Sequence, residues 1–492
     1  MPDDVVQEPA VSAGLPDQRE AIAGWYLRRS HRRLWMLPLT AWLLVFIAVL
    51  LLRGTVEDPR ANFRASQAAF LALAPPSLPK GENAAEDYAL AQTAFVPFAP
   101  AQGKSNSDLF SNITGDSKFF ETQEVQTFLA NNTLALQHLY AGAAKAKCNW
   151  GLNYDLRAKW GNPTRFPWGN NNENLLAAHA RASAHAGDHK AAAKSIATIY
   201  RLAEQCCSDP VFERCWGAVA TARLADRTVE AISTWDTPGS LDDLDAYRKA
   251  VWHPRWGSDV VLGFLAAWKK QGLGYMDGVA CGALQAGIFH SLPAQHLTPR
   301  GGGILGYGPE RHCVAAVMDE IIARSARGQY LNTKDMEELV AKHQTGPARL
   351  AAEIISYVQR HLERYANSEE QARVADAGLA FLMFRMKHGR DPKSLDELVP
   401  EFMPAVPQGI RCPQPLRMKM EPEGVFVKDV KNSPPVRRYP GATRIFAARS
   451  DGVDEGGYSS SDGFSLYDDK YNASFCVPPR EKPAPESGGK AP

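Results

Sequence analysis

The sequence predicts a mainly α-helical protein with a single N-terminal transmembrane helix and a small α+β module near its C-terminal end. Three observations lead to this fold class. They are an uncharged apolar run at residues 34–52, segments with apolar residues at helical spacing between residues 83 and 388, and alternating strand-like runs after residue 415. With 492 residues, of which 45% are hydrophobic, the chain can build several cores.

The apolar run Leu34–Leu52 holds no charged residue over 19 positions. As a helix it would be about 28 Å long, against roughly 30 Å for the hydrocarbon core of a bilayer. Four arginines precede it, Arg28, Arg29, Arg32 and Arg33, so the positive-inside rule places the N-terminus in the cytoplasm. No small-x-small cleavage site follows. We therefore expect a retained anchor, a location in the bacterial inner membrane, and a periplasmic position for most of the chain.

The remaining chain divides by composition. Asn83 can cap a helix that begins at Ala84, after a proline-rich spacer. The segment "ENLLAAHARASAHAGDHKAAAKSIATIYRLAEQCC" predicts a helical hairpin that turns at Gly187, with solenoid-like character. The predicted parts are a cytoplasmic leader (1–33), the transmembrane helix (34–52), a linker (53–82), an exported helical domain (83–365), an α+β module (366–476) and a disordered tail (477–492).

Two further helices are predicted in the helical domain, in "ERHCVAAVMDEIIARSARG" and "ARLAAEIISYVQRHLERYA". The glycine-rich stretch Leu297–Glu310 lacks the ending of a phosphate-binding loop, so we expect a flexible connector there. In the module, a helix ends near Gly389, and strands are expected in "LRMKMEP", "GVFVKDV" and "TRIFAAR".

The cysteines predict disulfides. All eight follow the predicted anchor, and an oxidising compartment would favour their pairing. We expect Cys412 to pair with Cys476, and Cys148 with one of Cys206, Cys207 or Cys215; the alternative is that they are small buried hydrophobic residues.

An acidic, glycine-interrupted loop near the C-terminus is a candidate calcium site. Its carboxylates are Asp451, Asp454, Glu455 and Asp462. Val453 occupies a ligand position of an EF-hand, so that motif is excluded. Either the carboxylates and nearby carbonyls wrap one calcium ion, or the loop is a solvated turn.

Residues 372–457 resemble the C-terminal region of the type II secretion major pseudopilin, through "HGRDPKSLDELVP", "PAVP" and "IFAARSDGVDEGG". This resemblance implies a hairpin followed by an acidic loop that binds calcium. The chain also resembles a planctomycete-type group of membrane-anchored proteins of unassigned function, through "GENAAEDY", "CNWGLNYD" and the helical hairpin. The second resemblance implies an architecture and no reaction.

Catalytic motifs are weak. His185 and His189 have the spacing of a zinc site, but Ala186 stands where a general base would be and Gly187 indicates a turn. The aromatic-rich segment 148–174 either lines a carbohydrate or peptide groove or plugs the helical domain. The lysine and arginine total of 55 is balanced by 54 acidic residues, which excludes a basic field for nucleic acid.

The sequence therefore favours a non-enzymatic interaction or structural protein of the cell envelope. Its partners would be the membrane, through residues 34–52, and an envelope protein of unknown identity. The alternative is an envelope hydrolase, with a site built from Asp155 or Glu173 and a distant histidine, or a carbohydrate- or peptide-binding protein; either would use the aromatic-rich segment 148–174.

Overall fold

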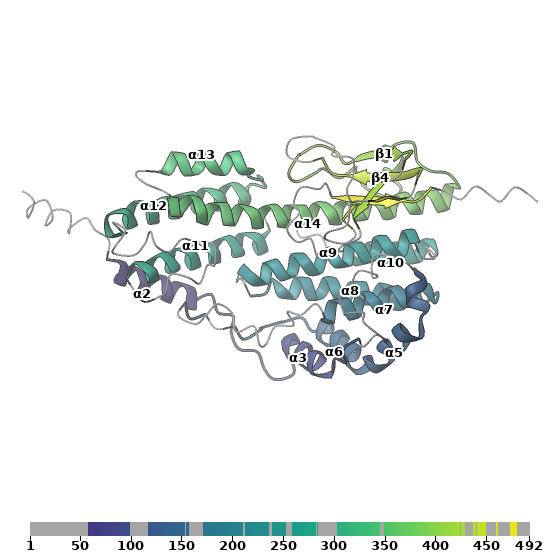
Figure 1. The fold of residues 1–492 in the computed structure, drawn as a ribbon, viewed down its shortest axis with the longest axis horizontal. Coiled ribbons are helices and arrows are strands. Elements are labelled where there is room, and N and C mark those ends of the chain that lie inside the picture. Colours follow the sequence, from purple (N-terminus) through teal and green to yellow (C-terminus); the bar gives the residue numbers. More distant parts are fainter. Residues whose placement is uncertain are drawn as a thin grey trace, which may run out of the picture. The chain divides into compact units, whose positions relative to one another are not determined.

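The helices dominate the structure, a computed structural model shown in Figure 1. It describes residues 58–98, 117–152, 154–156, 171–209, 212–235, 239–251, 258–281, 283, 303–344, 349–423, 425–428, 436–438, 440–448, 459–460 and 473–479. The chain separates into two units, Met1–Asp58 and Pro59–Pro492. Every helix and strand described below belongs to the second unit.

Twelve α-helices lie in the described residues. They are α2 (Pro59–Leu71), α3 (Ala84–Ala94), α5 (Gln123–Asn131), α6 (Thr133–Ala144), α7 (Asn171–His185), α8 (His189–Cys206), α9 (Phe212–Trp235), α10 (Leu241–Ala250), α11 (Asp259–Ala280), α12 (Gly303–Ala326), α13 (Thr333–His343) and α14 (Arg349–His388). Two short 3-10 helices, η1 (Ser117–Glu121) and η5 (Leu395–Leu398), complete the helical part.

The prediction of a single-pass membrane protein is corrected. Across the part of the chain that the structure describes, no helix has a stretch long and apolar enough to cross a membrane. The long helices α9 and α14 carry charged side chains in successive turns, and a hydrocarbon core disfavours each of these. The predicted span, 34–52, lies outside the described residues. The transmembrane helix, the inner-membrane location and the periplasmic placement conflict with this finding and are not retained.

The predicted helical hairpin is confirmed. Helices α7 and α8 pack against each other, and Gly187 in their connection has φ +80°, a left-handed conformation that glycine adopts without strain. Asp188 then caps α8 by accepting a hydrogen bond from the Ala191 N–H. Helix α3 also begins as expected, because the Asn83 side chain accepts from the Ala85 N–H.

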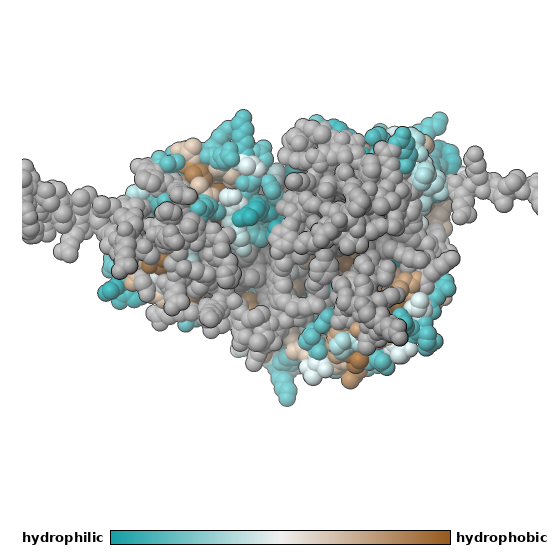
Figure 2. Space-filling view, in the orientation of Figure 1, coloured by the Kyte–Doolittle hydropathy of each residue, from teal (hydrophilic) through white to brown (hydrophobic). Residues whose placement is uncertain are grey.

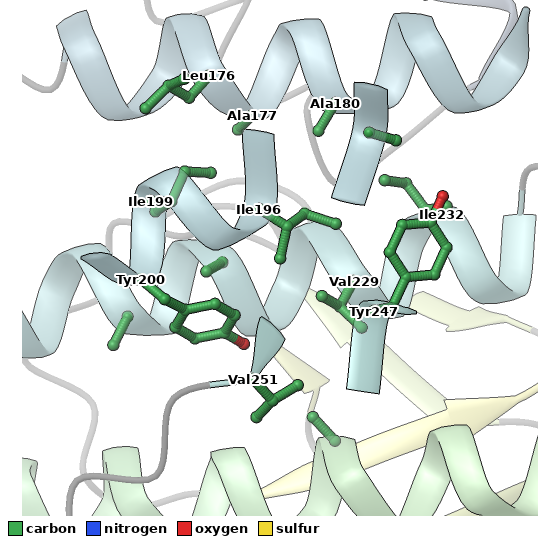
Figure 3. Packing of buried hydrophobic residues seen from close by; sticks show 14 of the residues in the cluster. Leu176, Ala177, Ala180, Ile196, Ile199, Tyr200, Val229, Ile232, Tyr247 and Val251 are labelled. Atoms are coloured by element: carbon green, nitrogen blue, oxygen red, sulfur yellow. The ribbon is translucent and has the colours of Figure 1, made fainter. Parts of the chain in front are cut away.

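The first hydrophobic core lies among α3, α5–α10 and the C-terminal half of α14. Figure 3 shows its centre, where Ile196 and Tyr200 of α8 face Val229 of α9 and Tyr247 of α10. Ala177 and Ala180 of α7 are fully buried there, and their small side chains permit close helix approach. The alanine-rich pattern of the hairpin is therefore the packing surface of this core.

The second core lies among α2, α11, α12, α13 and the N-terminal half of α14. The expectation of a connector over Leu297–Glu310 is wrong in its second half, because α12 already begins at Gly303 and contains Pro309. Tyr307 explains this, since its side chain is buried and its hydroxyl donates to Asp277 of α11. A long-range contact thus orders a segment whose glycines and proline predict a loop.

Helix α14 joins the two cores. The sequence predicts separate helices before and after residue 366, whereas the structure has one helix of 40 residues. Its residues up to Tyr365 belong to the second core, and those from Ala372 belong to the first. No glycine or proline interrupts the segment between, so nothing in the local sequence ends the helix there.

The C-terminal module contains two small sheets. The first has the order β1 (Arg417–Glu421), β4 (Ala442–Phe446) and β6 (Ser474–Val477), all antiparallel. The second has the order β3 (Val436–Arg438), β2 (Val425–Lys428) and β5 (Ser459–Ser460). The three predicted strands are present as β1, β2 and β4. Strand β1 pairs with β4, from Arg417 opposite Phe446 to Glu421 opposite Ala442.

The predicted disulfides are also corrected. None of the seven cysteines whose side chains the structure describes forms a disulfide. Five of these seven are buried, namely Cys148, Cys206, Cys313, Cys412 and Cys476. They occupy helix, loop and strand positions as small hydrophobic side chains, which is the alternative that the sequence left open.

Candidate functional site

The predicted calcium ligands Asp451, Asp454, Glu455 and Asp462 lie outside the described residues. Within the described ranges, no group of three or more His, Cys, Asp or Glu side chains could hold a metal ion. The calcium site therefore stays a prediction.

Trp150 and Tyr154, the aromatic residues of segment 148–174 that the structure describes, fill the protein interior. Trp150 is buried, stacks on Tyr88 with ring centroids 5.5 Å apart, and donates from Nε1 to the Gln205 carbonyl at 2.9 Å. Tyr154 is buried as well, and its hydroxyl donates to Asp209 Oδ1 at 3.0 Å. Both rings and both donors are thus committed to the interior, and neither ring lines a groove.

The histidines of the hairpin turn diverge. His185 Nε2 lies 2.7 Å from Glu121 Oε1 at the surface, whereas His189 is buried with Nδ1 2.8 Å from the Tyr247 hydroxyl. Because the turn at Gly187 separates two helices, the i,i+4 spacing does not place both rings on one helix face. These contacts identify His185 and His189 as structural residues of the hairpin.

His179 belongs to a different cluster. Its Nδ1 lies 2.9 Å from Ser195 Oγ and 3.3 Å from the Tyr140 hydroxyl. Ser195 Oγ also donates to the Ala191 carbonyl, and burial lowers the pKa of His179. Ser195 is fully buried, so this serine and histidine pair cannot meet a substrate as a nucleophile and base. It ties α6, α7 and α8 together.

Glu173 is the predicted catalytic candidate with the most unusual surroundings. It stands in the first turn of α7, is 9% exposed, and its Oε1 accepts from Thr221 Oγ1 of α9 at 3.3 Å. Among the described residues, its Oε2 has no hydrogen-bond partner, and the same is true of both amide atoms of Asn172 and of Nδ2 of Asn174. Burial raises the pKa of Glu173 to about 7, a value suited to proton transfer near neutral pH.

Asp155 and Glu173 have different surroundings. The neighbours of Asp155 in sequence, Tyr154 and Leu156, belong to the second core, and Asp155 itself is half-buried. Leu175, two residues after Glu173, belongs to the first core.

Two further buried acids lie on α9 and were missed by sequence reasoning. Asp226 Oδ1 accepts from the Tyr200 hydroxyl of α8 at 2.5 Å, and a carboxylate oxygen of Glu230 accepts from the Cys476 N–H of β6 at 2.8 Å. Burial raises the pKa of each to about 7. The signal was present, because acids four residues apart in "LADRTVEAI" interrupt an otherwise apolar helical pattern.

The middle of α14 is a buried polar belt. Every residue from Arg364 to Glu370 is buried, although five of these seven residues are polar. Glu370 Oε1 accepts from the Ile410 and Arg411 N–H groups at 2.8 and 2.7 Å. Its Oε2 forms an ion pair with the Arg411 guanidinium, whose side chain is 6% exposed. We call residues 364–370, with the loop residues 408–411 that they bind, the α14 junction.

The α14 junction fastens the module to the helices through several bonds. Arg373 forms an ion pair with Glu369 and donates to the Gln408 carbonyl at 2.7 Å. Nearby on the same helix, Asp376 receives the guanidinium of Arg248 from α10, and Arg248 also donates to the Phe402 carbonyl. Helix α14 thus holds loop 402–411 and α10 through charge-assisted hydrogen bonds.

Comparisons with known proteins give no relative: no family model, no curated protein and no solved structure matches the chain. The two resemblances drawn from the sequence therefore stay predictions.

Proposed function

We propose that this protein is a non-enzymatic interaction protein, a helical scaffold that holds its C-terminal module in a fixed position for a protein partner. The observation that carries this proposal is the α14 junction. One unbroken helix contributes to both cores, and a buried ion pair with two backbone hydrogen bonds fixes the loop of the module to its middle. Such a connection leaves no hinge between the helices and the module. The module therefore keeps a fixed position, as a scaffold that holds it for a partner requires.

Exposed apolar side chains support the same proposal. Leu90 of α3 is 50% exposed. Val96, just after α3, is 42% exposed, and Leu134 of α6 is 55% exposed. Figure 2 shows hydrophobic residues among hydrophilic ones where Figure 1 places α3, α5 and α6. Val96 and Leu134 both lie next to Asn132. The Asn132 side chain bonds both the N–H and the carbonyl of Val96, and Asn132 is the N-cap of α6, the helix that contains Leu134. Grouped apolar side chains at a surface are typical of protein contacts.

A photo-crosslinking experiment in the native cells tests the scaffold. A benzophenone amino acid is placed at position 134, and in a matched variant at exposed Gly263 of α11, away from the apolar group. The scaffold predicts a discrete crosslinked protein from position 134 that is weaker from position 263. The same crosslink should decrease when Glu370→Gln loosens the α14 junction in a chain that still shows native circular dichroism. Equal crosslinking from all three chains would contradict the proposal.

A second candidate function rests on Glu173. Its buried carboxyl with an unpartnered oxygen and a pKa of about 7 favours an acid or base role on a small polar substrate. The variant Glu173→Gln preserves size and one acceptor. Under this candidate it abolishes turnover of a peptide and oligosaccharide library while the crosslink from position 134 persists. Under the scaffold proposal, purified wild type turns over no member of the library, and Glu173→Gln changes nothing but stability.

A further inference from the structure

Strand β6 is attached to the helices along the edge that faces away from β4. Residues 474 and 476 point their backbone groups to this edge, where none of the described strands pairs with them. Gln371 of α14 donates from Nε2 to the Ser474 carbonyl at 3.0 Å and accepts from the Ser474 N–H at 3.3 Å. Glu230 of α9 accepts from the Cys476 N–H at 2.8 Å. Two side chains therefore take the place of a neighbouring strand.

These two attachments differ in chemistry. Gln371 is neutral at every physiological pH, whereas Glu230 is a titratable group that is partly buried between α9 and β6. Burial raises the pKa of Glu230 to about 7, and the hydrogen bond from Cys476 and the charge of Arg227 oppose this rise without cancelling it. Near neutral pH, the bond between α9 and β6 thus exists with both a neutral and an ionised acceptor.

The charged groups near Glu230 do not stabilise its ionised form enough to cancel the effect of burial on its pKa. On α9 itself, Arg227 favours the carboxylate, and Asp226 lies one turn away as a second acid. From the sheet, the Cys476 thiol interacts electrostatically with Glu230, with Arg444 of β4 and with Glu421 of β1. Arg444 is already engaged with Glu421, with Nε 3.0 Å from Oε1.

The titratable residues on the other elements that pack against α9 are either paired with an opposite charge or not positively charged. On α14, Glu370 is paired with Arg411, and Asp376 with Arg248. From α8, Tyr200 donates to Asp226, and burial keeps the pKa of this phenol well above its usual range. From α7, Glu173 is a third buried acid and not a source of positive charge.

We propose that Glu230 makes the seating of β6 on the helices dependent on pH, because the seated strand shuts its carboxyl away from water and this disfavours the ionised form more than the Cys476 N–H bond favours it. The inference goes beyond the scaffold function and does not require it. When β6 is released, Glu230 meets water and regains the ordinary pKa of 4.5 for a glutamate. The seated form therefore binds the proton more tightly, so seating is strongest below that value and weakens as pH rises toward about 7.

Hydrogen exchange of the full chain tests the proposal. Protection of the amides of Ser474–Val477, corrected for the intrinsic pH dependence of exchange, should fall on the order of tenfold between pH 5.5 and 8.5. Amides of α8 report global opening and should lose less protection. The variant Glu230→Gln keeps an oxygen acceptor for Cys476 and cannot ionise, so its β6 protection should stay constant over the same range.

The matched control is Asp226→Asn. It removes a buried acid one turn from Glu230 that bonds Tyr200 and makes no bond to β6, so β6 should keep its pH dependence. Labelling of the buried Cys476 thiol by a maleimide, relative to the unfolded chain at each pH, gives a second readout. A flat wild-type profile overturns the proposal even if Glu230→Gln fails to fold. So does a pH dependence that survives in Glu230→Gln.

Discussion

Gly378 of α14 lies directly against the ring of Phe475 on β6. A Cβ atom added at position 378 would stand 2.4 Å from Phe475 Cδ1 and 2.5 Å from Cγ, closer than atoms can approach. Phe475 is fully buried, so its ring has no space into which to move. The missing side chain of Gly378 is therefore what lets the sheet lie flush on the helix.

We predict that Gly378→Ala destabilises the protein. Alanine favours a helix over glycine by about 1 kcal/mol, but overpacking a buried ring costs about 1–3 kcal/mol, so the steric effect wins. Urea unfolding should show a net loss of up to about 2 kcal/mol. The control is Gly263→Ala in α11, where an added Cβ meets no atom within 4 Å. That variant should gain up to about 1 kcal/mol, and a loss in both variants would refute the steric explanation.

A second prediction concerns the ion pair of the α14 junction. In Glu370→Gln, the Arg411 guanidinium would keep its charge at a site with 6% exposure and lose the carboxylate that balances this charge, while its bond to Asn367 Oδ1 at 3.3 Å remains. Removing one member of a buried pair costs about 3–5 kcal/mol. The free energy of unfolding should fall by about that amount. The exposed pair Lys334 and Glu338, 3.9 Å apart, provides the control, since Glu338→Gln should cost no more than about 0.5 kcal/mol. Equal effects would mean that Arg411 finds other compensation.

Local patterns in the sequence predicted the start of α3, the α7–α8 hairpin, most of α12 and α14, and the strands β1, β2 and β4. The cap at Asn83, the turn at Gly187 and the apolar stripe through Val314 and Ile321 depend on neighbours a few residues away, and each is present in the structure. Helix α12 begins earlier than predicted because Tyr307 contacts Asp277, 30 residues away in sequence. Similarly, β1 pairs with β4 and not with the nearer β2. Contacts between residues so far apart in the sequence cannot be seen in its local composition or periodicity.

The candidate sites show the same limit. Glu173 could be named from the sequence, but its burial and its contact with Thr221 are properties of the packed helices. The pairing of Glu370 with Arg411 across 41 residues, and of Glu230 with Cys476 across 246, follows from how α14 and α9 meet the module. The acids were visible in the sequence, and their partners were not.

A third prediction concerns the contact that orders the start of α12. Tyr307→Phe removes a hydroxyl that donates to buried Asp277 and accepts from Asn62 Nδ2 at 3.2 Å, while the ring remains. The loss should be about 1–2 kcal/mol, because a buried acceptor loses one donor but keeps Ser66 and Arg311. Hydrogen exchange should show the loss at the amides of residues 303–308. Unchanged protection there would show that Tyr307 does not order this turn. Asn62→Ala, which removes only the outer bond, should have a smaller effect.

The last prediction concerns the pH dependence of stability through Asp226. Burial raises the pKa of this carboxyl from 3.8 to about 7 in the folded chain. Below 3.8 the acid is protonated in both states. Between the two values only the folded state holds the proton, so this contribution to stability falls as pH rises and is fully lost above about 7. Asp226→Asn keeps an oxygen for the Tyr200 hydroxyl and removes the titration.

The unfolding free energy of Asp226→Asn relative to wild type should therefore improve on the order of 2 kcal/mol between pH 5 and 8, whatever the fixed cost of the amide. Urea titrations at several pH values measure this difference, in which all other titrating groups cancel. Glu397→Gln is the control, because the hydrogen bond from Arg390 lowers the pKa of Glu397 and keeps this carboxyl ionised across this range. Its difference from wild type should stay constant, and a constant difference for Asp226→Asn as well would show that Asp226 is ionised in the folded core.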